Sequence, residues 1–263
     1  MEGTAIVLVG EEYEWHLFQL DLCTFEAELV VPHVGIDNFE VVGDQIFVHG
    51  GFDEDDPTFG GGWSHTAQVV DGWLQPIGPT DDAVFLGGTS ERGHLLLLKR
   101  QRGGGVKVFE WSEGELTPRH DLDLLGGRVW DARPGRGGLI VALSYDVDDN
   151  TFRCEVALDA LRRPDHRVAF PLEVCIAPRG LGDAMVVATV RPKATYVVDP
   201  TVPEVVDELP GWKALSWSPD GHQLLLADES GMLGIADSSN LNIVHRLGRP
   251  PLFGRVAGAA WTL

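Results

Sequence analysis

The chain has 263 residues and carries 20 Lys and Arg against 40 Asp and Glu, which gives a formal net charge of −20. So large a negative charge disfavours a protein that binds nucleic-acid phosphates or an anionic membrane face through its own surface. A hydrophobic content of 44% is enough for a large core and excludes a disordered chain. The 32 glycines and 16 prolines exclude an extended helical protein.

The N-terminal residues lack the pattern of a secretory signal. Met1-Glu2-Gly3 is followed by the short apolar run Ala5–Val9 and two glutamates, without the basic start that a signal needs. No apolar run reaches the roughly 18 residues that cross a bilayer. The three cysteines include no C-x-x-C pair. We therefore expect a cytoplasmic protein without a membrane partner.

Short strand-like runs rich in Val, Leu and Ile, bounded by Gly, Pro and Asp, follow one another along the whole chain. The first three are Thr4–Val9, Trp15–Asp21 and Ala27–Val31. Later runs fall into groups of four, whose first strands are expected to begin at Ile36, Asp82, Arg128, Glu173 and Lys213. The spacings of 46, 46, 45 and 40 residues fit a four-stranded propeller blade, for which roughly 40 to 50 residues is usual.

Each chain end holds an incomplete group. Three strands at the N-terminus lack a first strand, and Val256–Leu263 is a single strand with nothing after it. An open row of blades would leave unpaired strand edges. We expect the C-terminal strand (256–263) to pair with the N-terminal strands (4–32) and close the ring. The predicted fold class is therefore all-β, with residues 1–263 forming a single six-bladed β-propeller domain of four-stranded blades.

The segment Trp217-Ser218-Pro219-Asp220-Gly221, followed by Leu224–Asp228 and Ile235-Ala236-Asp237, resembles a blade of the WD-repeat propellers and their bacterial SPDG-type relatives. In such a turn Pro presets φ, Asp binds its own backbone and Gly takes the left-handed position. Ala236 stands where that family often has the Trp of its Trp-Asp pair. The resemblance implies a platform that binds other proteins and has no active site.

The longest predicted loop, residues 52–64, reads FDEDDPTFGGGWS. A loop of this length in a compact domain is unusual unless it is functional or disordered. Aromatic side chains among carboxylates would anchor a basic, partly apolar partner, and the alternative is a solvated insertion. The candidate partner-binding residues are Phe52, Asp53, Glu54, Asp55, Asp56, Phe59, Trp63 and Trp212.

Two further groups of residues could bind a metal ion. Asp146, Asp148 and Asn150 have the alternating spacing of a calcium loop, but Thr151 occupies the position of the sharp-turn Gly, so a polar hairpin turn is favoured. A second group would surround the mouth of the central channel, where some six-bladed hydrolases hold a divalent cation. Its members are Asp37, Asn38, Asp82, Arg128, Glu173, Lys213 and Arg255. Because three of them are cations, mutual ion pairing is favoured over metal capture.

The sequence contains no G-x-S-x-G or H-E-x-x-H motif. We therefore expect a non-catalytic protein-protein interaction module, such as a scaffold, adaptor or immunity-type inhibitor, that binds a basic or mixed-charge protein on an acidic rim. No cofactor and no nucleic acid are expected. The alternative is a metal-dependent hydrolase or lactonase with its site at the channel mouth.

Overall fold

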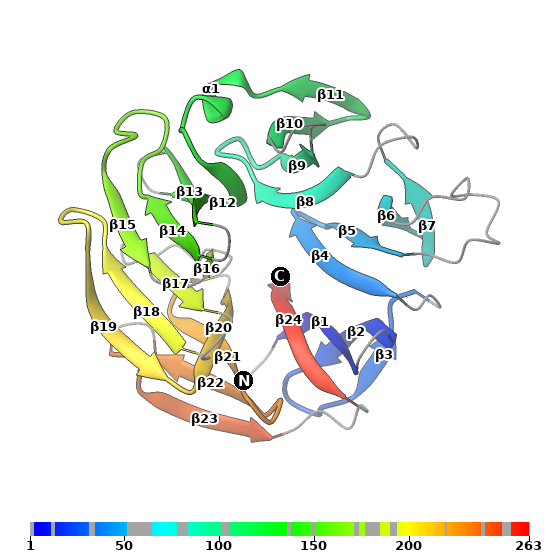
Figure 1. Ribbon diagram of the computed structural model, residues 1–263. Helices are drawn as coiled ribbons and strands as arrows, with labels where there is room; N and C mark the ends of the chain where they lie inside the picture. Colours follow the sequence, from blue (N-terminus) through cyan, green and yellow to red (C-terminus); the bar gives the residue numbers. More distant parts are fainter. Residues whose placement is uncertain are drawn as a thin grey trace.

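The computed structural model describes residues 3–11, 14–31, 35–51, 65–77, 84–100, 106–135, 138–148, 151–170, 174–176, 185–189, 194–218, 220–237, 240–248 and 254–262. These residues form 24 strands and one short helix, α1 (His120–Asp123). Figure 1 shows the sheets arranged around a common centre, in the manner of a propeller. No helix in this part of the chain has the length or the apolar character to cross a membrane.

Four of the five sheets have four antiparallel strands each. The sheet that contains both chain ends has the order β24 (Arg255–Thr262), β1 (Thr4–Glu11), β2 (Glu14–Asp21), β3 (Ala27–Leu29). The next has β4 (Ile36–Val42), β5 (Gln45–Gly50), β6 (His65–Val70) and β7 (Trp73–Pro76). The third has β16 (Val174–Ile176), β17 (Met185–Thr189), β18 (Ala194–Asp199) and β19 (Glu204–Pro210). The fourth has β20 (Trp212–Trp217), β21 (Gln223–Asp228), β22 (Leu233–Asp237) and β23 (Ile243–Gly248).

The fifth sheet has eight strands, in two consecutive groups of four. The first group is β8 (Val84–Thr89), β9 (Leu95–Arg100), β10 (Val106–Ser112) and β11 (Glu115–Pro118). The second group is β12 (Arg128–Gly135), β13 (Gly138–Asp148), β14 (Thr151–Ala157) and β15 (Arg167–Phe170). The starts of β4, β8, β12, β16 and β20 lie within two residues of the first-strand starts predicted from the repeat, so the grouping in fours is confirmed.

The last strand pairs with the first. β24 and β1 form an antiparallel ladder with Ala5 opposite Trp261 and Val7 opposite Ala259. At its end the Thr4 and Thr262 hydroxyl oxygens lie 2.6 Å apart. This is the pairing predicted from the incomplete groups at the two chain ends.

β1 shows why the sheets need neighbours on both sides. Ala5, Val7 and Val9 pack with residues of β20, β21 and β22, whereas Ile6 and Leu8 pack with residues of β4, β5 and β6. Successive side chains of a strand point to opposite faces, so a strand covered on both sides reads as a continuous apolar run. The run Ala5–Val9 is therefore core.

Six apolar clusters lie between consecutive groups of strands in the described residues. Two of them cover the two faces of β1. The third joins β5 to β8 and β9, and the fourth joins β9 to β13. The last two join β13 to β18 and β18 to β20. Each cluster contains buried or partly buried side chains from two neighbouring groups. The core is thus a set of layers between sheets instead of one central mass.

Asp220 and Gly221 of the Pro-Asp-Gly turn expected between β20 and β21 have the predicted chemistry, and Pro219 lies outside the described residues. Gly221 has φ +75°, the left-handed conformation that glycine tolerates. Asp220 accepts hydrogen bonds from the Ser218 hydroxyl and from the His222 amide, and these bonds lower the pKa of its carboxyl. The Gln223 amide donates to Ser218 Oγ at 2.9 Å, which ties the turn to the start of β21.

The two halves of the eight-stranded sheet meet at a single parallel bridge between Gly88 of β8 and Ala132 of β12. Gly88 follows a bulge in the β8–β9 ladder and has φ +97°. A Cβ at this position would lie 2.1 Å from the Ala132 carbonyl oxygen. The close approach of the two strands therefore requires glycine at position 88.

We predict that Gly88→Ala destabilises the protein more than Gly114→Ala. Gly114, in the β10–β11 turn, also has a positive φ of +86°, but nothing lies within 4 Å of a Cβ there. Its substitution should cost about 1 to 2 kcal/mol of unfolding free energy from backbone strain alone. Gly88→Ala should add about 1 to 3 kcal/mol for displacing β12. Chemical denaturation of both variants measures the difference, and equal losses would contradict the argument.

Candidate functional site

The acidic loop proposed from the sequence, with Phe52, Asp53, Glu54, Asp55, Asp56, Phe59 and Trp63, lies outside the described residues. The strands on either side of it are described, and Gly50 at the end of β5 pairs with His65 at the start of β6. His49 and His65 are both buried, and His49 Nδ1 lies 2.9 Å from Thr66 Oγ1. The loop thus departs from a buried part of the sheet.

Trp212 is not a surface anchor, which corrects the sequence-based assignment. Its side chain is only 8% exposed and belongs to the core layer between β18 and the β20–β23 sheet. Its ring fills the space beside Gly234, because a Cβ added at Gly234 would lie 2.9 Å from the Trp212 ring. The position reads as the start of a first strand, but the side chain points into the space between two sheets.

The calcium-loop candidates lie in a strand ladder. β13 runs as far as Asp148, and Asp146 pairs with Phe152 while Asp148 pairs with Thr151. Asn150 is outside the described residues. Asp146 and Asp148 are therefore strand residues and not loop residues, and the hairpin between β13 and β14 is shorter than the sequence pattern suggested. No group of three or more His, Cys, Asp or Glu in the described ranges is placed to hold a metal ion.

The channel-mouth candidates are divided between innermost strands. Asp82 and Glu173 are outside the described residues, and the others lie on β4 (Asp37, Asn38), β12 (Arg128), β20 (Lys213) and β24 (Arg255). Figure 1 shows these four strands nearest the centre of the arrangement. The structure therefore distributes these five residues over four strands around the centre.

Several of these side chains bind nearby groups. Asn38 Oδ1 accepts a hydrogen bond from the Phe39 amide at 2.8 Å. Lys213 Nζ donates to the Ala257 carbonyl at 3.4 Å and so links β20 to β24. Partial burial raises the pKa of Asp37. Asn38 and Lys213 thus make backbone contacts that belong to the fold.

A buried ion-pair network joins three innermost strands. Arg133 of β12 forms an ion pair with Glu40 of β4, and its Nη2 lies 3.3 Å from Asp131 Oδ1. The Thr89 hydroxyl, on β8, donates to Glu40 Oε1 at 3.0 Å. The side chains of Arg133 and Glu40 are 12% and 6% exposed, so neither charge is solvated by bulk water. Buried charges persist only when they are paired in this way.

The sequence did not predict this network, because the channel-mouth candidates were residues near the ends of the first strands. Glu40 and Asp131 lie inside their strands, each next to apolar residues that are core. A charged residue in the middle of an innermost strand is the signal that could have located the network. Ion pairing near the centre was expected, but these are different residues from those named.

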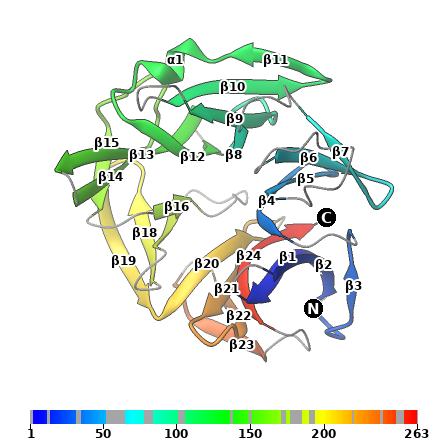
Figure 2. The same cartoon turned by 45° about the vertical axis from the view of Figure 1, so that its right-hand side comes forward.

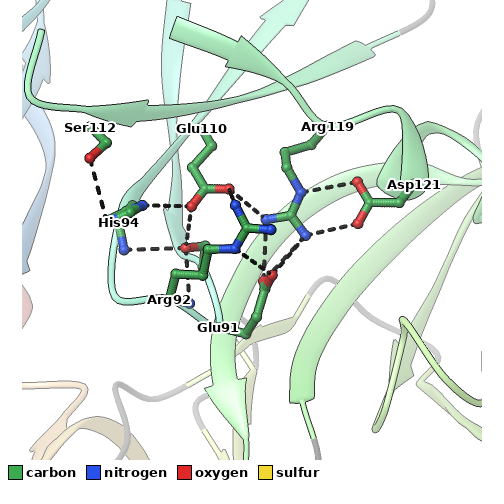
Figure 3. Close-up of polar contacts among 8 residues, drawn as sticks. Glu91, Arg92, His94, Glu110, Ser112, Arg119 and Asp121 are labelled. Atoms are coloured by element: carbon green, nitrogen blue, oxygen red, sulfur yellow. Dashed lines mark hydrogen bonds and ion pairs between the residues drawn. The ribbon is translucent and has the colours of Figure 1, made fainter. Parts of the chain in front are cut away.

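A second network, drawn in Figure 3, surrounds Arg119, which follows β11 and is 7% exposed at its side chain. Its Nη1 donates to Glu110 Oε2 at 2.9 Å and to Glu91 Oε2 at 3.2 Å. Its Nε and Nη2 form a bidentate pair with Asp121 of α1, at 3.0 and 2.8 Å. Hydrogen bonding to Asp121 raises the pKa of Arg119 further above its usual value. Arg119 thereby fastens α1 and the β8–β9 turn to the sheet.

Glu110 of β10 connects Arg119 to a histidine. His94 Nδ1 lies 2.8 Å from Glu110 Oε1, and the Ser90 hydroxyl donates to the same oxygen at 3.0 Å. Burial raises the pKa of Glu110, but the hydrogen bonds from His94, Ser90 and Arg119 outweigh it, so the pKa lies below its usual value. Glu110 is therefore a paired carboxylate rather than a proton donor.

The acidic residues are concentrated in one part of the chain. Residues 1–91 contain 18 Asp and Glu and no Lys or Arg, whereas residues 92–263 contain 22 Asp and Glu and all 20 Lys and Arg. Residues 1–91 include all strands of the β4–β7 sheet and three of the four strands of the sheet that joins the chain ends. Figures 1 and 2 show these two sheets side by side. Net charge alone did not reveal this asymmetry, but a count along the chain does.

Within the strands of those two sheets, Arg255 of β24 is the single Lys or Arg. Many carboxylates there are exposed, among them Glu26, Glu28, Asp44 and Asp71. The exposed strand and turn residues of these two sheets therefore carry mostly negative charge, whereas the buried Glu40 among them is paired with Arg133 of β12.

No protein-family model matches this sequence, and no curated protein matches it. Solved structures do resemble it. The crystal structure of the tricorn protease superposes with a TM-score of 0.63 and 11% identity over 96% of this chain and 27% of that one. The dihydro-heme d1 dehydrogenase NirN in complex with DHE gives a TM-score of 0.51 and 13% identity over 96% of this chain and 68% of that one. At such identities the likeness shows the fold alone, which is of the propeller type.

We predict that Arg119→Met lowers the unfolding free energy by about 3 to 5 kcal/mol, because it leaves Glu110 buried without its cation. Arg92→Met is the control, because Arg92 is 67% exposed and reaches the same carboxylate only at 4.0 Å. Its loss should be within about 1 kcal/mol. Equal losses in denaturant titrations would contradict a structural role for Arg119.

The same variant should change the acid sensitivity of the fold. Bonding to Arg119 lowers the pKa of Asp121, and the pKa of Glu110 is lowered as well, from usual values of 3.8 and 4.5. A lowered pKa in the folded state adds stability above the usual value, and this stability is lost as the pH falls through the lowered pKa. The unfolding free energy should therefore drop below pH 4.5 more steeply in the native protein than in Arg119→Met. Parallel profiles would contradict this.

Proposed function

We propose that this protein is a closed six-bladed propeller that binds a basic protein partner on the acidic side formed by residues 1–91 and carries out no catalysis of its own. The eight-stranded sheet then counts as two blades. Support for closure comes from the six core layers, one of which joins the last group of strands to the first. The turn at Ser218–Gly221 supports a relationship to SPDG-type repeats.

The observation that carries the binding proposal is the distribution of charge. The described part of residues 1–91 contains no Lys or Arg and exposes the carboxylates of Glu26, Glu28, Asp44 and Asp71, and such charges attract cationic surfaces over a Debye length of about 8 Å at physiological salt. Such complementarity accelerates encounter and selects against acidic partners. A scaffold, an adaptor or an inhibitor of a basic protein would all use the surface in this way.

Three arginines from later parts of the chain are used in internal contacts. Arg119 and Arg133 are buried in the two networks described above. Arg167 of β15 binds Glu155 at 3.2 Å and the Leu125 carbonyl at 3.1 Å. These cations stabilise contacts between strands and turns and are not free to cover the acidic side.

We predict that reversing exposed charges on the acidic side abolishes capture of basic proteins from a lysate, whereas reversing as many charges elsewhere does not. The first variant changes four residues to Lys: Glu26, Glu28, Asp44 and Asp71. The matched variant changes four exposed residues in the balanced part of the chain: Glu113, Glu115, Glu204 and Glu229. Both variants have the same net charge, so a difference between them reports position.

Affinity capture with mass spectrometry, at low and at raised salt, measures this difference. The isoelectric points of the proteins captured by the native chain should exceed those of the lysate as a whole. Equal capture by the two variants, or captured proteins without an excess of basic ones, would refute the proposed function. Matching melting temperatures ensure that both variants are folded.

The alternative, a metal-dependent hydrolase or lactonase at the channel mouth, involves Asp82 and Glu173, which lie outside the described residues. We predict that elemental analysis after dialysis finds no stoichiometric divalent ion and that lactone and ester substrates are not turned over. A retained ion together with turnover that is lost in Asp37→Asn would favour the alternative.

A further inference from the structure

A glutamate, a histidine and a serine are aligned at the end of the β9–β10 ladder (Figure 3). His94 Nδ1 lies 2.8 Å from Glu110 Oε1, and His94 Nε2 lies 3.4 Å from Ser112 Oγ. The two nitrogens of one imidazole ring therefore join a carboxylate to a hydroxyl. A nucleophilic hydroxyl, its general base and the group that orients the base have this arrangement on unrelated folds, and the bond to the hydroxyl is often long before a substrate is bound.

The register of the ladder explains why these side chains meet. Glu110 is directly opposite Leu96, and residues two apart in a strand share a face. Ser112 lies two residues after Glu110 and shares its face. His94 lies two residues before Leu96, so its ring reaches the same side of the ladder. The Ser90 amide donates to the His94 carbonyl at 2.8 Å and the His94 amide donates to Ser90 Oγ at 3.2 Å, which fixes the backbone of the histidine.

Glu110 determines which nitrogen of His94 carries the proton. Burial raises the pKa of Glu110, but hydrogen bonds from His94, Ser90 and Arg119 outweigh burial, so the carboxyl is ionised at neutral pH. An ionised carboxylate can only accept a hydrogen bond, so Nδ1 is the protonated nitrogen of the neutral ring. Nε2 then has a free lone pair that faces the Ser112 hydroxyl and can take its proton.

The histidine and the serine are reachable from solvent, whereas the carboxylate is not. The side chain of His94 is 40% exposed and that of Glu110 is 5% exposed. Ser112 is partly buried, and the next two residues, Glu113 and Gly114, form an exposed turn. Nothing lies within 4 Å of a Cβ added at Gly114. A small acyl donor can therefore approach Ser112 from the side of the turn.

We propose that Ser112 is a modification site that accepts an acyl group from a thioester or an equally activated ester, with His94 as the general base and Glu110 as the positioning residue. Ser112 Oγ attacks the acyl carbonyl carbon, and the hydroxyl proton passes to His94 Nε2 as the O–C bond forms. The bond from the acyl carbon to the thioester sulfur then breaks, and the departing thiolate takes the proton from Nε2. The products are the Ser112 ester and a free thiol, so atoms and charges balance.

The reaction stops at the ester, so one acyl group is consumed by each protein molecule. A thiol ionises at a pH of about 8.5, whereas an alcohol is a far weaker acid. A thiolate therefore leaves an acyl carbon much more readily than the Ser112 alkoxide would, and the ester forms faster than it hydrolyses. The proposal adds a covalent modification to the non-catalytic protein proposed above and does not depend on its acidic side.

The test uses p-nitrophenyl acetate, an activated ester whose coloured phenolate reports the reaction. We expect a burst of one equivalent of nitrophenolate per protein molecule, followed by a stop. Peptide mass spectrometry should place the acetyl group on Ser112. The burst should become slower in acid, because protonation of His94 removes the lone pair that accepts the hydroxyl proton.

Matched substitutions separate the constellation from general reactivity. Ser112→Ala should abolish the burst, and Ser112→Cys should restore it with a thiol nucleophile. His94→Gln should slow acetylation about a hundredfold or more. Ser230→Ala is the control and should leave the rate unchanged, because Ser230 also lies in an exposed turn but its hydroxyl donates to the carboxylate of Asp228 at 2.7 Å. Matching melting temperatures show that the variants are folded.

An equal burst in Ser112→Ala, or acetyl groups found on lysines or on His94 and not on Ser112, would overturn the inference. An unchanged rate in His94→Gln would overturn it as well, because the serine would then react without its base. Release that continues beyond one equivalent and depends on Ser112 would refute both the stoichiometric modification and the non-catalytic function. Failure of acetylation alone would refute only the modification, since partner capture by the acidic side is measured separately.

Discussion

The inner strands of this protein are largely apolar on both faces, and each sheet therefore needs a packed neighbour on each side. β1 meets this requirement through Ala5 and Val7 on one face and Ile6 and Leu8 on the other. β1 is also hydrogen-bonded to β24, the C-terminal strand. The residues of β1 therefore hold the two chain ends together and contribute side chains to two core layers. The other sheets pack in the same way, because a sheet without two packed neighbours would expose apolar area to water.

Charged residues reinforce the arrangement where neighbouring strands come closest. Arg133, Glu40 and Thr89 connect the innermost strands of three successive groups, and Arg119 holds α1 and the β8–β9 turn. Both arginines form ion pairs with two or more carboxylates, and these contacts are structural. Residues 1–91 contribute 18 Asp and Glu and no Lys or Arg, so the cations that pair with Glu40 and Glu91 come from later parts of the chain.

The repeat could be predicted because its signals are local. Strand patterns with Gly and Asp turns located the starts of β4 and β12 at the observed residue, and the chemistry of the Ser218–Gly221 turn was correct. Side-chain environment was harder to infer. Trp212 was taken for a surface residue, and Asp146 for a loop residue. The two errors have different causes: Trp212 is covered by side chains of the preceding group of strands, such as Val197, whereas Asp146 belongs to a ladder that continues to its pairing with Phe152.

The sequence by itself determined the all-β class, the grouping of strands in fours, the partner strands of the two chain ends and the total charge, because each depends on short patterns or on composition. Tertiary structure alone decided which charges are buried together and which apolar residues remain outside. Glu40 and Arg133 are 93 positions apart, and the Val30 carbonyl comes close to Gly72 only through the packing of two sheets. Burial and pairing depend on distances in space, and these exist only after the sheets have assembled around their centre.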